Sequence, residues 1–221
     1  DYHGIAENTL VIFSSDNGAE TNYQYQRATH GHYSSLHFKG GKRDIYEGGH
    51  RVPFLMRWPA GIAAGSQIDT PVCQTDFLAT IAAIVGLALP DEAAEDSYNL
   101  LPALRGEKSE AFIRGPVIHH SASGHFAIRE GKWKLNMFRG SGGSLKPNFV
   151  EPGPGEPIFE LYDLEADPGE TQNLYFDYPE IVEQLTEEIT KIIKKGRSTP
   201  GLSQDFVKSN WQQLTWMELE E

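Results

Sequence analysis

The chain has 221 residues, with 19 basic and 31 acidic side chains, and therefore carries a formal net charge of −12. This excess of negative charge argues against nucleic acid or an anionic membrane surface as a partner, because both attract cationic proteins. Apolar residues make up 39% of the chain, including four Trp and eleven Phe, which is enough to build a folded core. The single cysteine, Cys73, excludes an internal disulfide framework and a zinc site built from several cysteines. No apolar run approaches the ~18 residues that a membrane span requires.

Residues 1–110 have the pattern of part of a layered α/β domain. The continuous apolar run at residues 9–14 predicts a strand that is buried on both faces of a parallel or mixed sheet. Residues 52–58 predict a second strand. A helix follows, with Thr75 as its expected N-cap and apolar residues at helical spacing. This order predicts half of a sheet domain, whose first strand needs partners that the chain does not supply.

Residues 111–221 predict a small antiparallel sheet with one covering helix. Short strands are expected at residues 116–119 and 158–164, with a hairpin over residues 126–137. The glycine, serine and proline residues before the last strand predict a mobile surface loop. A stripe of isoleucine and leucine after Pro179, followed by lysines, predicts the covering helix. The sequence therefore divides into two parts of similar length.

Asp16, Asn17 and Gly18, which we call the Asp16 turn, directly follow the first strand. In open α/β sheets, ligands bind beyond the carboxyl ends of the strands. A carboxylate and an amide oxygen are hard ligands that suit Ca²⁺ or Mg²⁺ better than a soft metal. The turn is thus a candidate metal site, and an ordinary turn stays open as the alternative because Asn-Gly is a common turn former.

Residues 40–51, which we call the glycine loop, combine four glycines with several cations just before the second strand. Glycines let a backbone turn with positive φ and approach a ligand closely. Lys42 can offer a point charge to an anion, and its basic neighbours make a local positive region in an acidic chain. Those neighbours are Lys39, Arg43 and Arg51. An anion site and an ordinary solvated loop both fit this pattern.

Several segments along the chain, taken in order, resemble the sulfatase family of the alkaline-phosphatase-like superfamily. They are SDNG at residues 15–18, GK at 41–42, YEGGHRVP at 46–53, TDFL at 75–78, LPALRG at 101–106, FAIREGKWKL at 126–135 and ELYDLEADPGE at 160–170. The likeness extends to about residue 201 and concerns the C-terminal part of the family's proteins. It implies an α/β fold with a partial alkaline-phosphatase-like mixed sheet and flanking helices, plus a small C-terminal antiparallel sheet with a covering helix.

The resemblance also implies hydrolysis of a sulfate ester, as in the arylsulfatases. Asp16 and Asn17 match the family's pair of calcium ligands, and Mg²⁺ could take the place of Ca²⁺. Lys42 matches the lysine that contacts the sulfate oxygens, which makes it a catalytic and a substrate-binding candidate. Residues 47–49 match a structural turn that packs the glycine loop on the sheet.

The family's nucleophile has no counterpart in this sequence. In the family, a formylglycine made from Cys or Ser in a Cys/Ser-x-Pro-x-Arg motif attacks sulfur. Cys73 lacks the following Pro and Arg and is expected to be a small apolar residue. The formylglycine is therefore expected in a missing N-terminal part, and Asp16 and Asn17 cannot alone supply the about six to eight oxygens that calcium binds. We expect a C-terminal fragment that is inactive alone and that associates with the missing half or with itself.

His30 and His32 lie between the Asp16 turn and the glycine loop, and they are candidate substrate-binding residues for a small-molecule or glycan sulfate ester. An imidazole titrates near neutral pH and can donate a hydrogen bond or a proton to a leaving group. Such histidines are more often simply part of a surface loop, and that alternative stays open.

Two other functions stay open. A phosphate or phosphonate ester hydrolase of the same superfamily would share the sheet and the metal end. Asn17 favours the sulfatase, because a site for a dianionic phosphate usually has more Asp and His around two metals. The third interpretation is a noncatalytic, carbohydrate-binding fragment. The compartment cannot be read from the chain, although the resemblance is compatible with a periplasmic, secreted or lysosomal protein.

Overall fold

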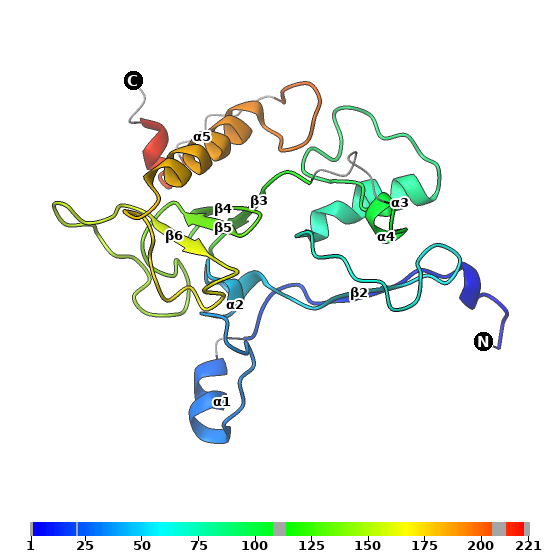
Figure 1. The fold of residues 1–221 in the computed structure, drawn as a ribbon, viewed down its shortest axis with the longest axis horizontal. Coiled ribbons are helices and arrows are strands. Elements are labelled where there is room, and N and C mark those ends of the chain that lie inside the picture. Colours follow the sequence, from blue (N-terminus) through cyan, green and yellow to red (C-terminus); the bar gives the residue numbers. More distant parts are fainter. Residues whose placement is uncertain (1, 21, 108–113, 205–210, 219–221) are drawn as a thin grey trace. The chain divides into compact units, whose positions relative to one another are not determined.

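The computed structural model describes residues 2–20, 22–107, 114–204 and 211–218 (Figure 1). The chain forms two compact units, each built from separate segments. The first consists of Asp1–Ser15, Pro53–Val117 and Ile192–Phe206, and the second of Asp16–Val52, Ile118–Lys191 and Val207–Glu221. The domain boundary expected at residue 110 lies outside the described residues, so that division stays a prediction. None of the helices in the described parts of the chain has the length and apolar character that a membrane crossing needs.

The first unit contains a two-stranded antiparallel ribbon, formed by β1 (Val11–Ser14) and β2 (Phe54–Arg57). Both strands lie where the sequence predicts them. Phe13 stands opposite Leu55, and these side chains are 64% and 59% exposed. The expectation that β1 is buried on both faces therefore does not hold in this structure, because within the described residues β2 is the only strand that pairs with it.

Helix α3 (Phe77–Ile84) follows the ribbon and is anchored at its start by Asp76. The carboxylate of Asp76 accepts hydrogen bonds from the backbone N of Cys73 at 2.8 Å and of Tyr98 at 3.0 Å. The N-cap predicted at Thr75 is wrong, because Asp76 occupies the N-cap position of α3, and its side chain fixes the flanking backbone rather than capping the helix. The unit also contains the short helices η1 (Ala6–Asn8), η2 (Gln74–Asp76) and α4 (Leu101–Leu104).

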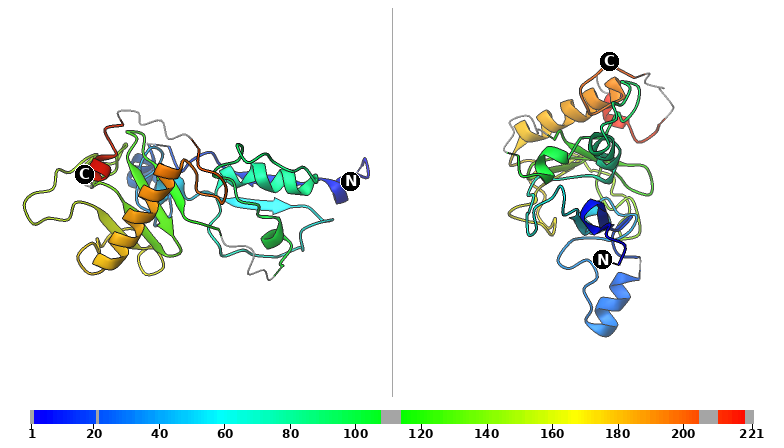
Figure 2. Two further views of the ribbon diagram at one scale, coloured as in Figure 1. Left: turned by 90° about the horizontal axis from the view of Figure 1, so that it is seen from above. Right: turned by 90° about the vertical axis from the view of Figure 1, so that its right-hand side faces the viewer.

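The second unit is built on a four-stranded sheet in the order β3-β4-β5-β6. The pairs β4–β5 and β5–β6 are antiparallel, and helix α5 (Pro179–Lys195) lies across the sheet (Figures 1 and 2). The small antiparallel sheet and its covering helix are thus confirmed. The strands are β3 (Val117–His120), β4 (Phe126–Glu130), β5 (Trp133–Asn136) and β6 (Glu160–Asp163).

This sheet buries both of its faces, and the two faces differ in chemistry. The face under α5 is apolar, with Ile128, Leu135 and Leu161 aligned across the strands and fully buried. On the other face, Lys134 stands between Arg129 of β4 and Tyr162 of β6. Ile45 and Tyr46 of the glycine loop belong to the same buried cluster as Tyr162. The glycine loop therefore covers the polar face of the sheet.

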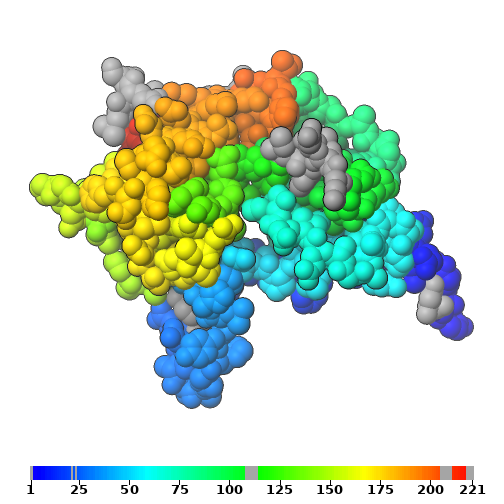
Figure 3. Space-filling view, viewed as in Figure 1, coloured from blue at the N-terminus to red at the C-terminus, as the bar shows by residue number. Residues whose placement is uncertain are grey.

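Two helices of the second unit occur where the sequence shows no helical pattern. Helix α1 (Tyr23–His30) ends at Gly31, which has a φ of 62° and whose N donates to the carbonyl of Arg27 at 3.1 Å. Its segment projects from the rest of the second unit (Figure 3). Helix α2 (Glu47–His50) is one short turn inside the glycine loop, and η3 (Thr215–Glu218) lies near the end of the chain.

Candidate active site

Backbone hydrogen bonds join the Asp16 turn to the glycine loop. The N of Gly18 donates to the carbonyl of Gly49 at 2.9 Å, and the N of Lys42 donates to the carbonyl of Ala19 at 2.7 Å. A Cβ atom on Gly18 would lie 1.7 Å from the carbonyl oxygen of Gly48, so the contact requires glycine. The two clusters that the sequence singles out thus meet in one site within the second unit.

Asp16 and Asn17 offer oxygen donors at the surface of this site. Asp16 is exposed and Asn17 is half-buried. The Nδ2 of Asn17 donates to the carbonyl of Gly18 at 3.0 Å, which directs its Oδ1 away from that bond. A carboxylate and an amide oxygen fit Ca²⁺ or Mg²⁺ in kind. In the described residues, however, no three or more His, Cys, Asp and Glu side chains gather as a metal site, so these two donors fit only part of a coordination shell.

The side chain of Lys42 reaches Glu20, two residues beyond the Asp16 turn. Its Nζ lies 3.1 Å from Oε2 of Glu20, and Nη1 of Arg43 lies 3.6 Å from Oε1 of that carboxylate. The sequence analysis did not identify Glu20, although an acidic residue just after the Asp16 turn is a visible signal. A substrate anion at Lys42 has to compete with Glu20 for the ammonium group.

Asp44 fixes the glycine loop to the segment after β5. Its buried carboxylate accepts hydrogen bonds from the N of Gly41 at 2.9 Å, of Ser144 at 2.5 Å and of Leu145 at 3.0 Å. Ser141 in this segment is also fully buried. The prediction of a mobile surface loop is therefore wrong at its start, because Asp44 supplies an acceptor for these backbone groups.

A group of buried charges lies between the glycine loop and the sheet. The Nζ of Lys134 lies 3.1 Å from Oε1 of Glu47 and 2.9 Å from Oε1 of Glu170. These three side chains are at most 2% exposed. Oε2 of Glu170 accepts the N of Glu47 at 2.6 Å, and Nη1 of Arg129 lies 3.2 Å from Oε2 of Glu47. We call Glu47, Lys134, Glu170 and Arg129 the buried ion cluster.

The pKa values in the buried ion cluster follow from burial and from charge pairing. Burial raises the pKa of Glu47, but the charges of Lys134 and Arg129 outweigh it and hold this pKa below its ordinary value. Burial lowers the pKa of Lys134, but Glu170 and Glu47 outweigh it and raise this pKa. For Glu170, burial dominates and raises the pKa. Lys134 and Glu47 are therefore a charged pair at neutral pH.

The architecture and the site agree with the comparison to known families. A family model described as N-sulphoglucosamine sulphohydrolase, C-terminal, matches residues 37–195, which include the whole glycine loop and the whole sheet of the second unit. The chain belongs to the sulfatase family. This finding confirms the resemblance carried by the ordered sequence segments.

The names of two relatives of this sulfatase chain refer to different sulfated compounds. An N-acetylgalactosamine-6-O-sulfatase of Bacteroides thetaiotaomicron is 31% identical over 205 residues, 85% of this chain and 37% of the relative. Human arylsulfatase A is 36% identical over 182 residues, 77% of this chain and 34% of the relative. The chain thus spans about a third of the length of these relatives.

A solved structure supports the fold of the sulfatase chain. The matching protein was determined in complex with its substrate D-glucosamine-2-N,6-O-disulfate, with a TM-score of 0.64 and 25% identity. The match covers 87% of this chain and 35% of that one. The α/β fold class of the alkaline-phosphatase-like superfamily is therefore confirmed.

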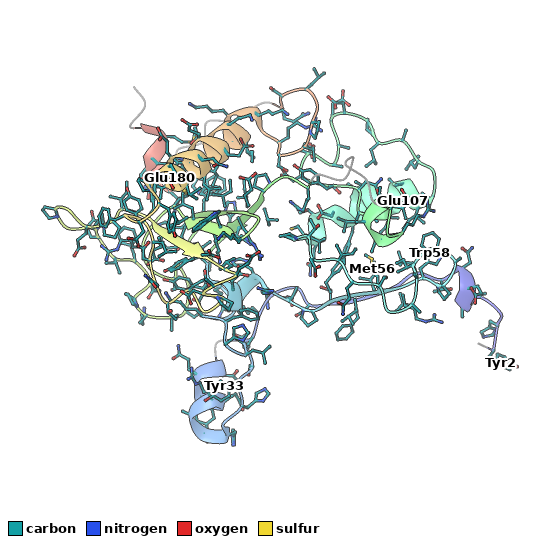
Figure 4. The ribbon with its side chains drawn as sticks, viewed as in Figure 1. Tyr2, Tyr33, Met56, Trp58, Glu107 and Glu180 are labelled. Carbon is teal, nitrogen blue, oxygen red and sulfur yellow. The ribbon has the colours of Figure 1, made fainter. Side chains whose placement is uncertain are left out.

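The histidines proposed from the sequence lie on and just after helix α1, outside the two joined clusters. His30 ends α1 and His32 follows it, and both are exposed. The ring of His30 is 6.2 Å from the ring of Tyr25, and Tyr33 on the same segment is covered by Arg27 at 4.7 Å (Figure 4). None of the hydrogen bonds described for the glycine loop reaches either histidine. Their role in substrate binding stays a prediction.

His50, at the end of α2, lies closer to the buried charges than His30 or His32 does. Burial, together with the charge of Lys134, lowers its pKa from 6.5 to about 4. Its ring centroid is 4.6 Å from that of His119 on β3. His50 is therefore neutral at pH 7 and cannot serve as a cation for a sulfate group.

Proposed function

We propose that the protein containing this chain hydrolyses sulfate esters, and that this chain supplies part of the active site. Asp16 and Asn17 would bind a divalent cation, and Lys42 would bind the sulfate oxygens. One observation supports this most strongly: in a chain of the sulfatase family, backbone hydrogen bonds join the Asp16 turn to the loop that carries Lys42.

Calcium is the proposed cation, with Mg²⁺ in second place. When bound, the ion would polarise a sulfate oxygen as a Lewis acid. Asp16 and Asn17 would give it two oxygen ligands, and the other ligands have to come from elsewhere in the protein. We further propose that the nucleophile is a formylglycine outside these 221 residues.

Lys42 would act on the sulfate group itself. A fixed positive charge beside an anionic ester lowers the energy of the transition state as charge builds on the leaving oxygen. The ammonium group can reach such a ligand because its side chain is one-third exposed and the ion pair that it makes with Glu20 is itself at the surface. The lysine is therefore the residue of this chain that we assign to catalysis.

The proposed substrate is a sulfated sugar or another small sulfate ester. Among the relatives, one is named for N-acetylgalactosamine 6-O-sulfate, one for aryl sulfates, and a solved structure holds a sulfated glucosamine. Each substrate presents a sulfate group on a carbon skeleton, so the sulfate is the feature that this part of the site would recognise.

Sulfate release by the protein containing this chain tests the proposal. It would be incubated with N-acetylgalactosamine 6-sulfate, glucosamine 6-sulfate and an aryl sulfate, and with the matching phosphate esters as controls. We expect release from at least one sulfate and a much slower reaction with its phosphate counterpart. Faster release of phosphate would favour the phosphatase alternative, and no release from any ester would favour a noncatalytic protein.

A further inference from the structure

The buried ion cluster has no role in the proposed chemistry, yet it lies directly beneath the loop that carries Lys42. We propose that Glu170 and Lys134 are positioning residues, which act through Glu47 to hold Lys42 and the Asp16 turn in register. The inference rests on the proposed function only for what these two segments do.

The first step is the fixing of α2 by the cluster. Oε2 of Glu170 accepts the backbone N of Glu47, the first residue of α2, at 2.6 Å. Lys134 holds the carboxylates of Glu47 and Glu170 on either side of its ammonium group. The start of α2 is thus held by its backbone and by its side chain at once.

The second step is the contact between α2 and the Asp16 turn. Gly49 accepts the N of Gly18 at 2.9 Å, and a Cβ on Gly18 would lie 1.7 Å from the carbonyl oxygen of Gly48. On its other side, a Cβ on Gly48 would lie 2.5 Å from the carbonyl oxygen of Lys39. Backbones packed this closely cannot move independently, so a shift of α2 moves the Asp16 turn.

The third step is that Glu170 holds both ends of the segment around Lys42. Besides the bond to Glu47, its carbonyl oxygen accepts Nζ of Lys39 at 3.2 Å. Lys39 also lies 3.8 Å from the ring centroid of Tyr46. Lys42 therefore sits in a short loop whose two ends, Lys39 and Glu47, are secured by one residue.

The backbone of Glu170 supports a specific role. It has a φ of 52°, a backbone conformation that residues other than glycine rarely adopt. Such strain persists only where surrounding contacts over-determine it, and it is common at functional sites. Well-packed apolar residues often stabilise a core as well as buried ion pairs do, so stability alone does not require charges here. In contrast, the hydrogen bond from the N of Glu47 to the carboxylate of Glu170 fixes the position at which α2 begins.

Hydrogen exchange in Glu170→Ala and Glu170→Gln variants of the protein containing this chain tests the inference. In Glu170→Ala, the N of Glu47 loses its acceptor while Lys134 keeps Glu47 as a partner. We expect the amides of Gly18 and Lys42 to exchange at least about tenfold faster, while the β4–β5 amides stay protected. Glu170→Gln retains an acceptor oxygen and should restore much of the protection. Lys132→Met, which removes an exposed ammonium group 2.6 Å from Asp163, is the matched control and should change neither amide.

Kinetics of the same variants separate positioning from general weakening. We expect Glu170→Ala to lower kcat by roughly 10²-fold with little change in KM, the scale of a small misplacement of reacting groups. Glu170→Gln should recover part of kcat.

The outcomes distinguish this inference from the proposed function. Unchanged exchange at the amides of Gly18 and Lys42 in Glu170→Ala would overturn the inference whatever the activity. An equal increase in exchange at the β4–β5 amides would also overturn it. If Glu170→Ala does not fold, the exchange rates of the same amides are measured in Glu170→Gln. A local increase smaller than that expected for Glu170→Ala supports the inference, and no increase overturns it. Faster local exchange in a protein whose sulfate release is insensitive to Lys42 substitution would support positioning and reject the proposed function.

Discussion

Lys42 and Lys134 both pair with glutamate, but they lie in opposite environments. The side chains of Lys42 and Glu20 are 33% and 52% exposed, whereas Lys134 is fully buried between Glu47 and Glu170. Exposed ion pairs contribute about 0–1 kcal/mol and are screened by salt. A buried charge that loses its partner costs far more, because nothing replaces the lost solvation. Under the proposed function, the same pairing of residue types would serve ligand exchange at the surface and geometry in the interior.

If Lys42 binds the sulfate group as proposed, this difference explains how one short segment could hold a ligand and still stay fixed. Lys42 can leave Glu20 for another anion at small cost, because water solvates the released carboxylate. Lys134 cannot leave Glu47 and Glu170 without removing the cation that these two buried carboxylates share. Stability and ligand binding are thus divided between two lysines that are linked through Glu47 and the glycine loop.

The largest expected effect on stability comes from Lys134→Ala in the 221-residue chain. The substitution leaves the carboxylates of Glu47 and Glu170 buried without their shared cation. We expect the free energy of unfolding to fall by about 3–5 kcal/mol, measured by urea denaturation. Lys42→Ala, as the matched lysine at the surface, should change it by no more than about 0.5 kcal/mol. Similar losses in the two variants would remove the contrast between them.

The next largest effect is that of Lys42→Ala on turnover by the protein containing this chain. Removing one preorganised charge from a transition state lowers kcat by roughly 10² to 10³-fold. Sulfate release under saturating substrate measures this effect, with Lys132→Met as a control for the loss of a surface lysine. A decrease of less than about threefold would exclude Lys42 from the proposed role.

A third effect concerns acid and the buried imidazole of His50. Burial lowers its pKa from 6.5 to about 4, and the groups that face it are Lys134, Glu47, His119 and His120. Between these two pH values the unfolded chain binds more protons at this site than the folded chain does. Stability is therefore fully present above pH 6.5 and falls as the pH drops toward 4, by up to roughly 3 kcal/mol.

Urea denaturation of the wild-type chain and of His50→Asn between pH 7 and pH 4 isolates this contribution. Asparagine can still donate to the backbone of Asp44, the hydrogen bond that the imidazole makes, but it does not titrate. The loss of stability in acid should be smaller in His50→Asn. Parallel pH profiles for the two chains would show that His50 does not titrate in this way.

The outcome for the fold shows which elements are encoded locally. Helix α5 carries a clear stripe of isoleucine and leucine after Pro179, and the hairpin of β4 and β5 surrounds a Gly-Lys turn, so both follow from the sequence. Helix α1 lacks an apolar stripe, and α2 contains two glycines. Helix α2 depends on hydrogen bonds to distant segments, such as the bond from the N of Glu47 to Glu170, which no local pattern reveals.

The site divides in the same way. The Asp16 turn and the glycine loop are recognisable because each is a compact run of chemically informative residues. The buried ion cluster is not, since Glu47 is 87 positions from Lys134 and 123 positions from Glu170 in the sequence. A lysine in a strand is also normally expected at the surface. Only the tertiary structure shows that the polar face of the sheet is covered.

The smallest expected effect is that of Glu20→Gln, which tests the surface pair directly. In this variant the carboxylate of Glu20 no longer competes with a sulfate ester for the ammonium group of Lys42, so the ester should bind more tightly. Because an exposed pair is worth about 0–1 kcal/mol, KM should fall by no more than about fivefold, with kcat little changed. The decrease should shrink in high salt, which screens the exposed charges. A rise in KM instead would mean that Glu20 orients Lys42 for the substrate rather than competing with it.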